Sequence, residues 1–515
     1  MKKMLTIILA LLLIVAVAAG CAPQQTTAPT QSTTTTPGTE TTGTTAPSGP
    51  SIDFDEEPYV VNLQLVALFE KNTDLEKIEE AINVITLAKV NAKVDIQQIF
   101  IGDLKEKTSL AVAGDEKIDI ITGGLTQRVE TLVPDGILLE LDDLLAERGQ
   151  GILEVIGDYK SAGVFDGTTY AVTALPFPAT SGGFVYNKKM ADELDIVIPD
   201  RATMADLTAA FAKVKETGVY GIMNGGGLLQ YKFYKNMQVY GNNGAYGVIL
   251  DPINSTKIEN VFASADYKAY LELTKSWADA GYNPTDAMTD TTPGQQYFSE
   301  GKIFGLPTGF SPDQFKSWQA GRPFEVAIAQ MDDAVISTAG VTEVMYGIAS
   351  NCERPDKAMD ILNLIYTDTD IGNLLNYGLE NLNYKRVAGS ESVITAEGAE
   401  SGPDGYRIVF SRFGNPLNNL VMSPLTDSYY DDLKAFNAAA KVTKDFGYSF
   451  DPTPVAAEGA QIANVIAEYM PLLESGFATD LDAQLAAFLA ALDNAGMADV
   501  IAENQAQLDA FLAGK

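Results

Sequence analysis

Carboxylates are the side chains in this sequence with the widest capacity for catalysis or metal binding. The chain has 68 acidic residues, including the adjacent pairs Asp142-Asp143, Asp332-Asp333 and Asp431-Asp432. Two carboxylates about 5–10 Å apart can act as a glycosidase pair, and several together can bind calcium. The calcium-like run from Asp368 fails because Gly372 stands one position early. Since chance pairs are frequent among so many acids, we expect these carboxylates on the solvated surface and predict no metal site.

Histidine is absent from the chain, which excludes Ser-His-Asp and Cys-His catalysis and histidine-ligated zinc or copper. The two cysteines are Cys21 and Cys352. If Cys21 is modified, Cys352 has no partner for an intrachain disulfide and no histidine base, so we expect a structural thiol. We therefore expect a protein that is not an enzyme and needs no cofactor. A secreted glycan hydrolase that uses a carboxylate pair stays the alternative from another class.

Cys21 is the residue with the clearest chemistry. Lys2 and Lys3 precede an apolar run from Leu5 to Ala19, and the small residues before Cys21 give a lipoprotein signal peptidase access to the backbone. About 15 apolar residues are short for a membrane span, which favours a removed signal peptide. We predict residues 1–20 as a lipoprotein signal peptide and Cys21 as the site of diacylglycerol attachment. The alternative is an ordinary secretory signal that ends near a cysteine.

The segment after Cys21 has the composition of a flexible tether. From Ala22 to Pro50 there are 12 threonines in 29 residues, one charge and no large apolar residue. Such a segment cannot form a core, so we predict residues 21–57 as a disordered tether. Two acyl chains on the cysteine would hold it firmly at a membrane. We expect the chain on the extracellular face of the bacterial cytoplasmic membrane.

The net charge of the chain restricts the molecules that it can bind, and its length indicates how many lobes it forms. The chain has 35 basic and 68 acidic residues, a formal net charge of −33. An acidic surface repels nucleic acid and anionic headgroups, so we predict no nucleic-acid partner. The part after the tether is too long for one hydrophobic core and indicates at least two lobes.

Strand and helix signals alternate after the tether. Apolar, β-rich runs are followed by apolar residues at helical spacing, and Thr73-x-x-Glu76 has the pattern of a capping box. We expect strands at 60–66, 94–99 and 118–121 and helices at 73–85 and 103–114. This order predicts an α/β fold with a parallel sheet covered by helices on both faces. Ligands of such sheets lie beyond the carboxyl ends of the strands, here at 67–70 and 122–125.

A second α/β region is expected from Gly182, with a helix from Met204 to Val214, and the C-terminus is helical. Trp277 follows Leu271 and Leu273 in a helical pattern, so we expect it in a core. Apolar stripes in the C-terminal helices are interrupted by polar residues, so we interpret them as packing faces and not as membrane spans.

Several segments, in order, resemble the extracellular solute-binding proteins of bacterial ABC transporters, in the large sugar-binding superfamily. They are DLKEKTSLAVAGDEKIDI at 103–120, DGTTYAV at 166–172 with VYNK at 185–188, YGIAS at 346–350 before PDKAM at 355–359, NYGLE at 376–380, and the tail from Ile462 to Leu512. The tail is similar to that of a long-chain subgroup with an extra C-terminal region. The likeness extends over residues 58–515.

The resemblance implies a two-lobed, periplasmic-binding-protein-like (type II) fold with discontinuous lobes, a hinge and a ligand cleft between the lobes. Lobe 1 would comprise 58–177 and 341–372, and lobe 2 would comprise 178–340 and 373–460. The hinge candidates are Leu175–Ser181 and Ser337–Val341, and helices in 461–515 would brace both lobes.

The resemblance also implies a function. A lipid-anchored, monomeric solute-binding protein would capture a small polar solute, expected to be a saccharide, by hinge closure and deliver it to the permease subunits of an ABC importer. The alternatives are a binder of peptides or other small solutes, or a sensor that presents its ligand to a membrane kinase.

Sugars are bound by aromatic faces and by side chains that donate and accept hydrogen bonds. The chain offers aromatic residues around its glycine-rich loops, among them Tyr231. By position in the family, Thr308 and Phe310 would contact the ligand, with Gly123 and Gly124 opposite and Phe177 near the lobe crossing. The alternative for each aromatic residue is core packing. The predicted ligand-binding residues are Gly123, Gly124, Phe177, Tyr231, Thr308 and Phe310.

Overall fold

The computed structural model describes residues 51–67, 72–165, 167–224, 230–288, 292–312, 314–319, 322–408 and 412–514. The predicted signal peptide, the lipidation site Cys21 and the tether up to residue 50 lie outside the described residues. Everything below concerns the compact unit that starts at Gly49.

The first sheet has five strands in the order β2-β1-β3-β13-β6. Strands β1 (Tyr59–Ala67), β2 (Ala92–Phe100) and β3 (Ile120–Gly124) are parallel, as predicted. Strand β13 (Val344–Ile348) is antiparallel to both β3 and β6 (Val172–Thr173). The second half of β1 is buried at successive positions because helices cover both faces of the sheet.

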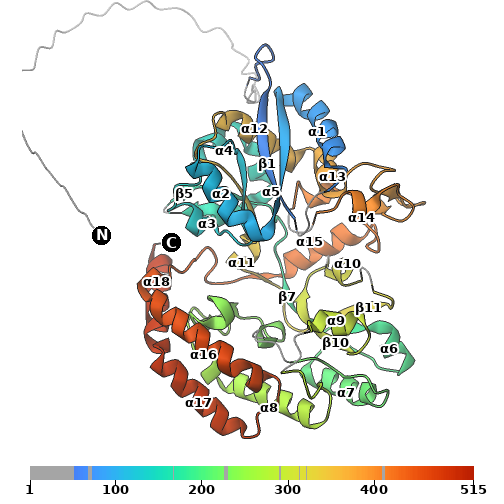
Figure 1. Ribbon diagram of the computed structural model, residues 1–515, viewed down its shortest axis with the longest axis vertical. Helices are drawn as coiled ribbons and strands as arrows, with labels where there is room; N and C mark the ends of the chain where they lie inside the picture. Colours follow the sequence, from blue (N-terminus) through green and yellow to red (C-terminus); the bar gives the residue numbers. More distant parts are fainter. Residues whose placement is uncertain are drawn as a thin grey trace, which may run out of the picture. The chain divides into compact units, whose positions relative to one another are not determined.

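Helices α1 (Leu75–Val90), α2 (Leu104–Ala113) and α12 (Pro355–Thr367) surround this sheet (Figure 1). The helical spacing in α1 is confirmed, since Leu75, Ile78 and Ile82 are buried in the core of the first sheet. The predicted capping box at Thr73 is wrong. The N-cap is Asp74, whose carboxylate instead accepts hydrogen bonds from Ser401 and Asn383.

The second sheet is antiparallel, with the order β10-β7-β11. Its strands are β7 (Ser181–Asn187), β10 (Gly305–Phe310) and β11 (Val326–Gln330). Helices α7 (Met204–Lys215) and α8 (Ala265–Asp279) pack in its core, where Phe211 and Trp277 meet edge to face at 5.1 Å. Trp277 is fully buried, which confirms its predicted core position.

The C-terminal helices α16 (Ala456–Glu474), α17 (Leu481–Asn494) and α18 (Met497–Ala513) pack into the core of the second sheet. Phe488 of α17, for example, lies 4.9 Å from Phe262, ring centre to ring centre. Leu508 of α18 is buried in a separate cluster with Tyr240 and Tyr448. That the helices brace both lobes stays a prediction. Among the described residues no single helix has the length and apolarity of a membrane span, and the pair α17–α18, bent by 62°, meets that test only jointly.

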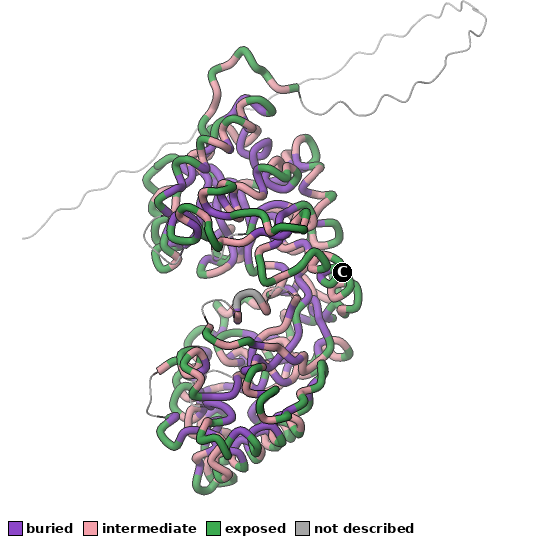
Figure 2. Tube along the Cα trace, turned by 90° about the vertical axis from the view of Figure 1, so that its right-hand side faces the viewer, coloured by how far each residue is buried: buried purple, intermediate pink, exposed green. Residues whose placement is uncertain are grey.

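Residues after α12 differ from the predicted lobe assignment. Leu375 of α13 (Thr369–Tyr377), Tyr406 and Phe413 lie in the core of the first sheet. Phe413 stacks on Tyr346 of β13 at 5.6 Å. The assignment of 373–413 to lobe 2 is therefore wrong, because these apolar side chains cover the face of α12 and β13. Figure 2 shows buried segments in the interior of both the upper and the lower part of the molecule, with exposed segments around them.

Three chain segments run between the two cores, at 174–181, 335–343 and 441–446; we call them the three crossings. Thr180 and Val335 exchange backbone hydrogen bonds of 3.0 and 2.8 Å. Strand β12 (Val335–Ile336) pairs in parallel with β17 (Lys441–Val442). Both predicted hinge segments lie in the first two crossings, and α11 (Thr338–Val341) is the helical turn of the second. Hinge motion itself stays a prediction.

Candidate functional site

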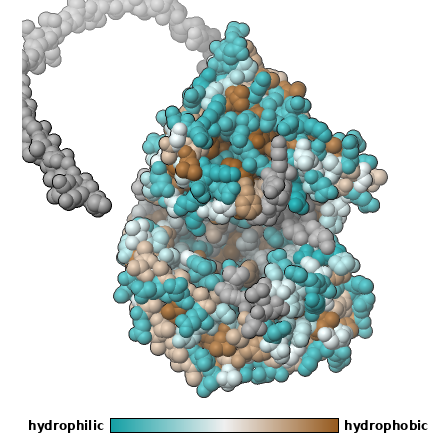
Figure 3. All heavy atoms as spheres, in the orientation of Figure 1, coloured by the Kyte–Doolittle hydropathy of each residue, from teal (hydrophilic) through white to brown (hydrophobic). Residues whose placement is uncertain are grey.

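A cavity of about 240 Å³ opens beside the three crossings, and we call it the crossing cavity. It lies between the start of β7, the end of β10, the chain after the 3₁₀ turn η3 (Gln230–Phe233), and the crossings. The surface in Figure 3 is hollowed between the elements of the first sheet and those of the second. The residues that line the crossing cavity are Thr180, Ser181, Gly182, Lys232, Phe233, Asn236, Met237, Gln238, Pro252, Gly309, Val335, Ser337 and Thr443.

Two glycines paired across β7 and β10 shape this cavity. A Cβ on Gly182 would lie 2.3 Å from the carbonyl oxygen of Phe233, so only glycine lets η3 approach β7 this closely. A Cβ on Gly309, its partner in β10, would meet no atom within 4 Å. Gly182 therefore brings the η3 segment to the wall of the cavity, and Gly309 leaves space there.

Thr443 lines the crossing cavity and carries a buried hydroxyl without a hydrogen-bond partner among the described residues. Thr443 is 3% exposed, and in the described part of the chain its Oγ1 has no hydrogen-bond partner. Its backbone N–H donates to Ile336 O at 3.0 Å, which fixes the residue in the third crossing. An unpaired buried hydroxyl costs about 1–3 kcal/mol, so a hydrogen-bond partner supplied at this position would stabilise the protein.

Other polar groups are held in place by the backbone. Ser337 Oγ accepts from Gly340 N–H at 3.3 Å and so caps α11. The backbone N–H of Asn236 donates to Asp332 at 2.9 Å, and this bond fixes the segment that carries Asn236 and Gln238. Hydroxyl and amide side chains both donate and accept hydrogen bonds, so this wall can recognise hydroxyl groups.

Lys232 is the one charged side chain among the described residues that line the cavity. Its Nζ lies 5.0 Å from the centre of the Phe233 ring. Desolvation lowers the pKa of Lys232 below its ordinary value. The aromatic face and the cation therefore lie side by side at the wall that η3 forms.

Thr308 and Phe310 point away from the crossing cavity. Thr308 Oγ1 accepts from Trp318 Nε1 at 3.0 Å, and the Phe310 ring packs against Phe436 at 5.5 Å. Side chains alternate along a strand, so Gly309, which stands between them, faces the opposite side, towards the cavity. The predicted residues Thr308 and Phe310 therefore lie on the strand that borders the crossing cavity but are not among its lining residues, and their contact with ligand stays a prediction.

The other predicted ligand residues also serve packing. Tyr231 is 7% exposed and lies in the second core, 5.1 Å from the Tyr270 ring, while Phe233 reaches the cavity two residues later. Gly123 and Gly124 end β3 and pair with β13. Gly124 has φ +78°, and a Cβ there would lie 2.3 Å from the carbonyl oxygen of Glu343.

Phe177 is half-buried in the first crossing and, like Gly123 and Gly124, is not among the residues that line the cavity. The residues that sequence reasoning missed are Lys232, Asn236, Gln238, Gly309 and Thr443. The alternation of side chains along β10 was a usable signal for Gly309. No local pattern marked Thr443.

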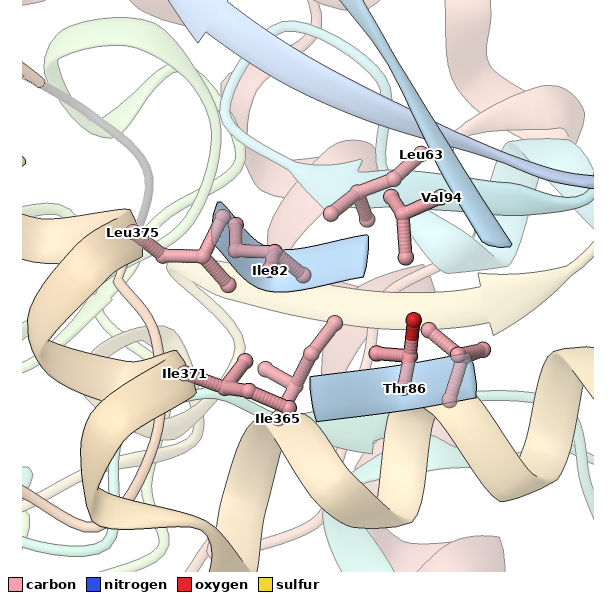
Figure 4. A pocket seen from close by; sticks show the side chains of 8 residues that line it. Leu63, Ile82, Thr86, Val94, Ile365, Ile371 and Leu375 are labelled. Carbon is pink, nitrogen blue, oxygen red and sulfur yellow. The ribbon is translucent and has the colours of Figure 1, made fainter. Parts of the chain in front are cut away.

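An apolar space behind the first sheet is no alternative site. Side chains from β1, β2, α1, α12 and α13 converge there, among them Leu63, Ile82, Ile365 and Leu375 (Figure 4). It has no room for a water molecule. Thr86 is its one polar side chain, so the space is a packing gap in the core.

Members of two carboxylate pairs have partners within the fold, and Cys352 is a half-buried thiol. Asp142 accepts from the backbone and hydroxyl of Thr169, and Asp333 pairs with Arg201 at 2.6 Å. Within the described ranges, no group of three or more His, Cys, Asp or Glu side chains could hold a metal ion. Burial, with a hydrogen bond to Asp119, raises the pKa of the half-buried Cys352 thiol.

Comparison with known proteins identifies the fold. A curated relative, a carbohydrate ABC transporter substrate-binding protein of Streptococcus pneumoniae, is 24% identical over 92% of this chain and 94% of its own length. The crystal structure of an N-glycan transport solute-binding protein of the same organism matches with a TM-score of 0.77 at 22% identity, over 88% of this chain and 99% of that one. Its complex with Man1GlcNAc matches with a TM-score of 0.69 at 23% identity, over the same shares of the two chains. The fold is thus the two-lobed α/β fold of type II solute-binding proteins.

Two family profiles match the sequence. Residues 445–513 match a domain of unknown function. Residues 73–370, more than half of the chain, match the family described as bacterial extracellular solute-binding protein. The protein therefore belongs to the bacterial extracellular solute-binding proteins.

Proposed function

We propose that this protein binds a saccharide in the crossing cavity and delivers it to the permease of an ABC importer. The names of the relatives support a sugar, since one is a carbohydrate transporter component and another was crystallised with Man1GlcNAc and with Man5GlcNAc. The protein would release its ligand chemically unchanged, which distinguishes a binding protein from a hydrolase.

The lining of the crossing cavity supports the same ligand class. Sugar hydroxyls need partners that donate and accept, and the C–H face of a sugar ring packs on an aromatic ring. The cavity offers Thr443, Ser337 and Gln238 for the hydroxyls and Phe233 for the ring face. Its volume is below the roughly 300–1,000 Å³ of typical small-molecule sites, so it suits one sugar unit of a longer chain.

The observation that carries the proposal is the unpaired hydroxyl of Thr443, buried at a point where all three crossings line one cavity. A ligand that binds there contacts Thr180, Ser337 and Thr443 together. Contacts that are present in only one arrangement of the lobes shift the equilibrium towards that arrangement. Hinge closure is established for periplasmic binding proteins as a class, and the crossings are where it would act here.

The location and the partners complete the proposal. Residues 1–20 would be removed, and Cys21 would carry the lipid. The segment after Cys21 would tether a monomeric binding unit at the outer face of the membrane. The end of the predicted tether 21–57 already belongs to that unit, because Ile52 packs on the first core and Glu56 pairs with Arg354 and Lys357. The permease subunits would be its protein partners.

A thermal-shift screen tests the ligand class. The chain from residue 22 onward is heated with Man1GlcNAc, Man5GlcNAc, maltose and maltotriose, and with tripeptides to hexapeptides as the contrast set. A ligand at about 100 times its Kd adds about 2.7 kcal/mol of stability, which raises the Tm by a few degrees for a chain of this size. We expect a shift with one saccharide series and recovery of that sugar unchanged by mass spectrometry. A shift with peptides alone, or consumption of the sugar, would contradict the proposal.

A further inference from the structure

Glu474, at the C-terminal end of α16, is a buried carboxyl group that has no basic partner among the described residues. It is 6% exposed and borders the core of the second sheet. Its Oε1 accepts from the Tyr267 hydroxyl at 2.9 Å, and its Oε2 accepts from the backbone N–H of Gln230 at 3.2 Å. Burying an ionisable group is costly unless it is hydrogen-bonded or neutralised. The two hydrogen bonds of Glu474 connect α16 to α8 and to the start of η3.

The groups that face Glu474 are phenols and amides. Tyr267 and Tyr270 come from α8, and Tyr234 and Gln230 come from the η3 segment. In the described part of the chain, the Tyr234 and Tyr270 hydroxyls and Gln230 Oε1 have no hydrogen-bond partner. Burial raises the pKa of Glu474 to about 8, although its two hydrogen bonds oppose the rise. Burial also raises the pKa values of the three tyrosines, so they stay neutral where Glu474 titrates.

A second set of hydrogen bonds connects the same end of α16 to the chain at Asn224. The backbone carbonyl of Ser475 accepts from Asn283 Nδ2 at 3.0 Å. The same amide donates to Asn224 O at 2.8 Å, and Asn224 N–H donates to Asn283 Oδ1 at 2.9 Å. The end of α16 therefore holds the chain at Asn224 through Asn283 and at Gln230 directly.

The chain held in this way forms a wall of the crossing cavity. Gln230 begins η3, which carries Lys232 and Phe233 to that wall. The carbonyl of Phe233 lies against Gly182, where a Cβ would be only 2.3 Å away. A displaced η3 segment would therefore change both the cavity lining and its contact with β7.

We propose that Glu474 is a positioning residue for the solute site, because its carboxyl group fixes the backbone at Gln230 and thereby places Phe233 and Lys232. The C-terminal region that matches a domain of unknown function would then help to position the residues of the binding site. The identity of the ligand rests on the proposed function, whereas the bond between Glu474 and Gln230 does not.

The test compares Glu474→Ala and Glu474→Gln in the chain from residue 22 onward. Glutamine keeps one acceptor oxygen and the shape of the side chain, so it should rescue the position of η3, whereas alanine cannot. Two matched controls separate positioning from stability. Glu468→Ala changes an exposed carboxylate of the same helix, and Leu492→Ala weakens the same core without touching Gln230.

Two readouts are measured for each variant, the Kd for Man1GlcNAc by calorimetry and the exchange rate of the Gln230 amide by hydrogen–deuterium exchange. We expect Glu474→Ala to speed exchange at Gln230 and to weaken binding by up to about tenfold, the upper end of the effect of one lost hydrogen bond between neutral groups. Glu474→Gln should stay within about threefold of the parent protein, and both controls should leave Kd unchanged.

Either of two results would overturn the proposal: unchanged exchange at Gln230 in Glu474→Ala, or an equal loss of affinity in Leu492→Ala. If the parent protein does not bind Man1GlcNAc, the ligand choice fails and the exchange readout decides alone. Faster exchange at Gln230 confined to Glu474→Ala then supports the positioning role, and any other exchange pattern rejects it.

Discussion

The hydroxyl of Ser449 donates a hydrogen bond of 2.8 Å to the carboxylate of Glu130. Ser449 stands between Tyr448 and Phe450, which pack with the second lobe, and Glu130 belongs to α3 (Val129–Leu132) beside the first sheet. Glu130 also pairs with Arg128 at 3.2 Å. This contact joins the two lobes outside the crossings and involves a group that titrates.

Replacing Glu130 by glutamine should change how stability depends on pH. Burial alone would raise the pKa of Glu130, but Arg128 and the hydrogen bonds, including that from Ser449, outweigh it and lower the pKa below 4.5. The folded state then binds fewer protons than the unfolded state, so the stabilisation is present above about pH 4.5 and is lost as the pH falls. We expect Glu130→Gln to be less stable than the parent at pH 7, and we expect the difference in unfolding free energy to shrink as the pH falls below about 4.5.

Urea unfolding at pH 7, 4 and 3 measures this difference. Ser276→Ala is a suitable control, because Ser276 is exposed within α8 and bonds only to its own helix. A difference between Glu130→Gln and the parent that stays constant across the three pH values would contradict the role given to this carboxylate.

Replacing Glu474 by glutamine should change the pH dependence of stability in the direction opposite to that expected for Glu130→Gln. Burial raises the pKa of Glu474 to about 8 from an ordinary value of 4.5, so the folded state holds the proton more tightly. The stabilisation is complete below about pH 4.5 and is lost as the pH rises towards 8. We expect Glu474→Gln, which never ionises, to gain in Tm relative to the parent between pH 5 and 9, and a fall in relative Tm would argue against it.

Replacing Gly309 should fill the crossing cavity without disturbing the sheet. A Cβ there meets no atom within 4 Å, and valine is favoured in strands. We expect Gly309→Val to change the unfolding free energy by less than about 1 kcal/mol and to weaken sugar binding at least about tenfold.

Calorimetric titration and urea unfolding of Gly309→Val give both quantities. Gly182→Ala is the contrasting variant, since its Cβ would collide with Phe233 and should destabilise the fold. Full affinity in a folded Gly309→Val protein would place the ligand elsewhere.

Replacing Thr443 by valine should stabilise the protein without ligand. The substitution keeps the shape and removes a buried hydroxyl that has no hydrogen-bond partner among the described residues. Removal of the unpaired hydroxyl is expected to add about 1 kcal/mol to the unfolding free energy. Sugar binding should weaken, because the ligand loses a hydrogen-bond partner. Thermal unfolding with and without sugar reports both effects, and a destabilised ligand-free variant would mean that the hydroxyl already has a partner.

Much of the first sheet could be predicted from local patterns. The βαβ order of β1, α1, β2, α2 and β3 follows from apolar periodicity, because each element buries its own face. The antiparallel β13 could not be placed by the same means, since its neighbours β3 and β6 are far away in sequence. The same limit explains why Leu375 and Phe413 were assigned to the wrong lobe.

The candidate site was predictable only in outline. Family position pointed to Thr308 and Phe310 of β10, the strand whose Gly309 lines the crossing cavity, but these two side chains lie on the other face of that strand. Thr443 lies at the site because β17 pairs with β12, a contact between distant parts of the chain that no short pattern in the sequence encodes.

The place of β13 in the first sheet also bears on how the chain folds as it is made. Strands β1 to β3 are complete by residue 124, but the strand that covers the open edge of β3 is supplied only by residues 344–348. Until then that edge carries unpaired backbone groups, which invite pairing with other chains. Contacts this distant in sequence also slow folding. The edge of β3 in a nascent chain of this protein therefore stays unpaired until residues 344–348 have been synthesised.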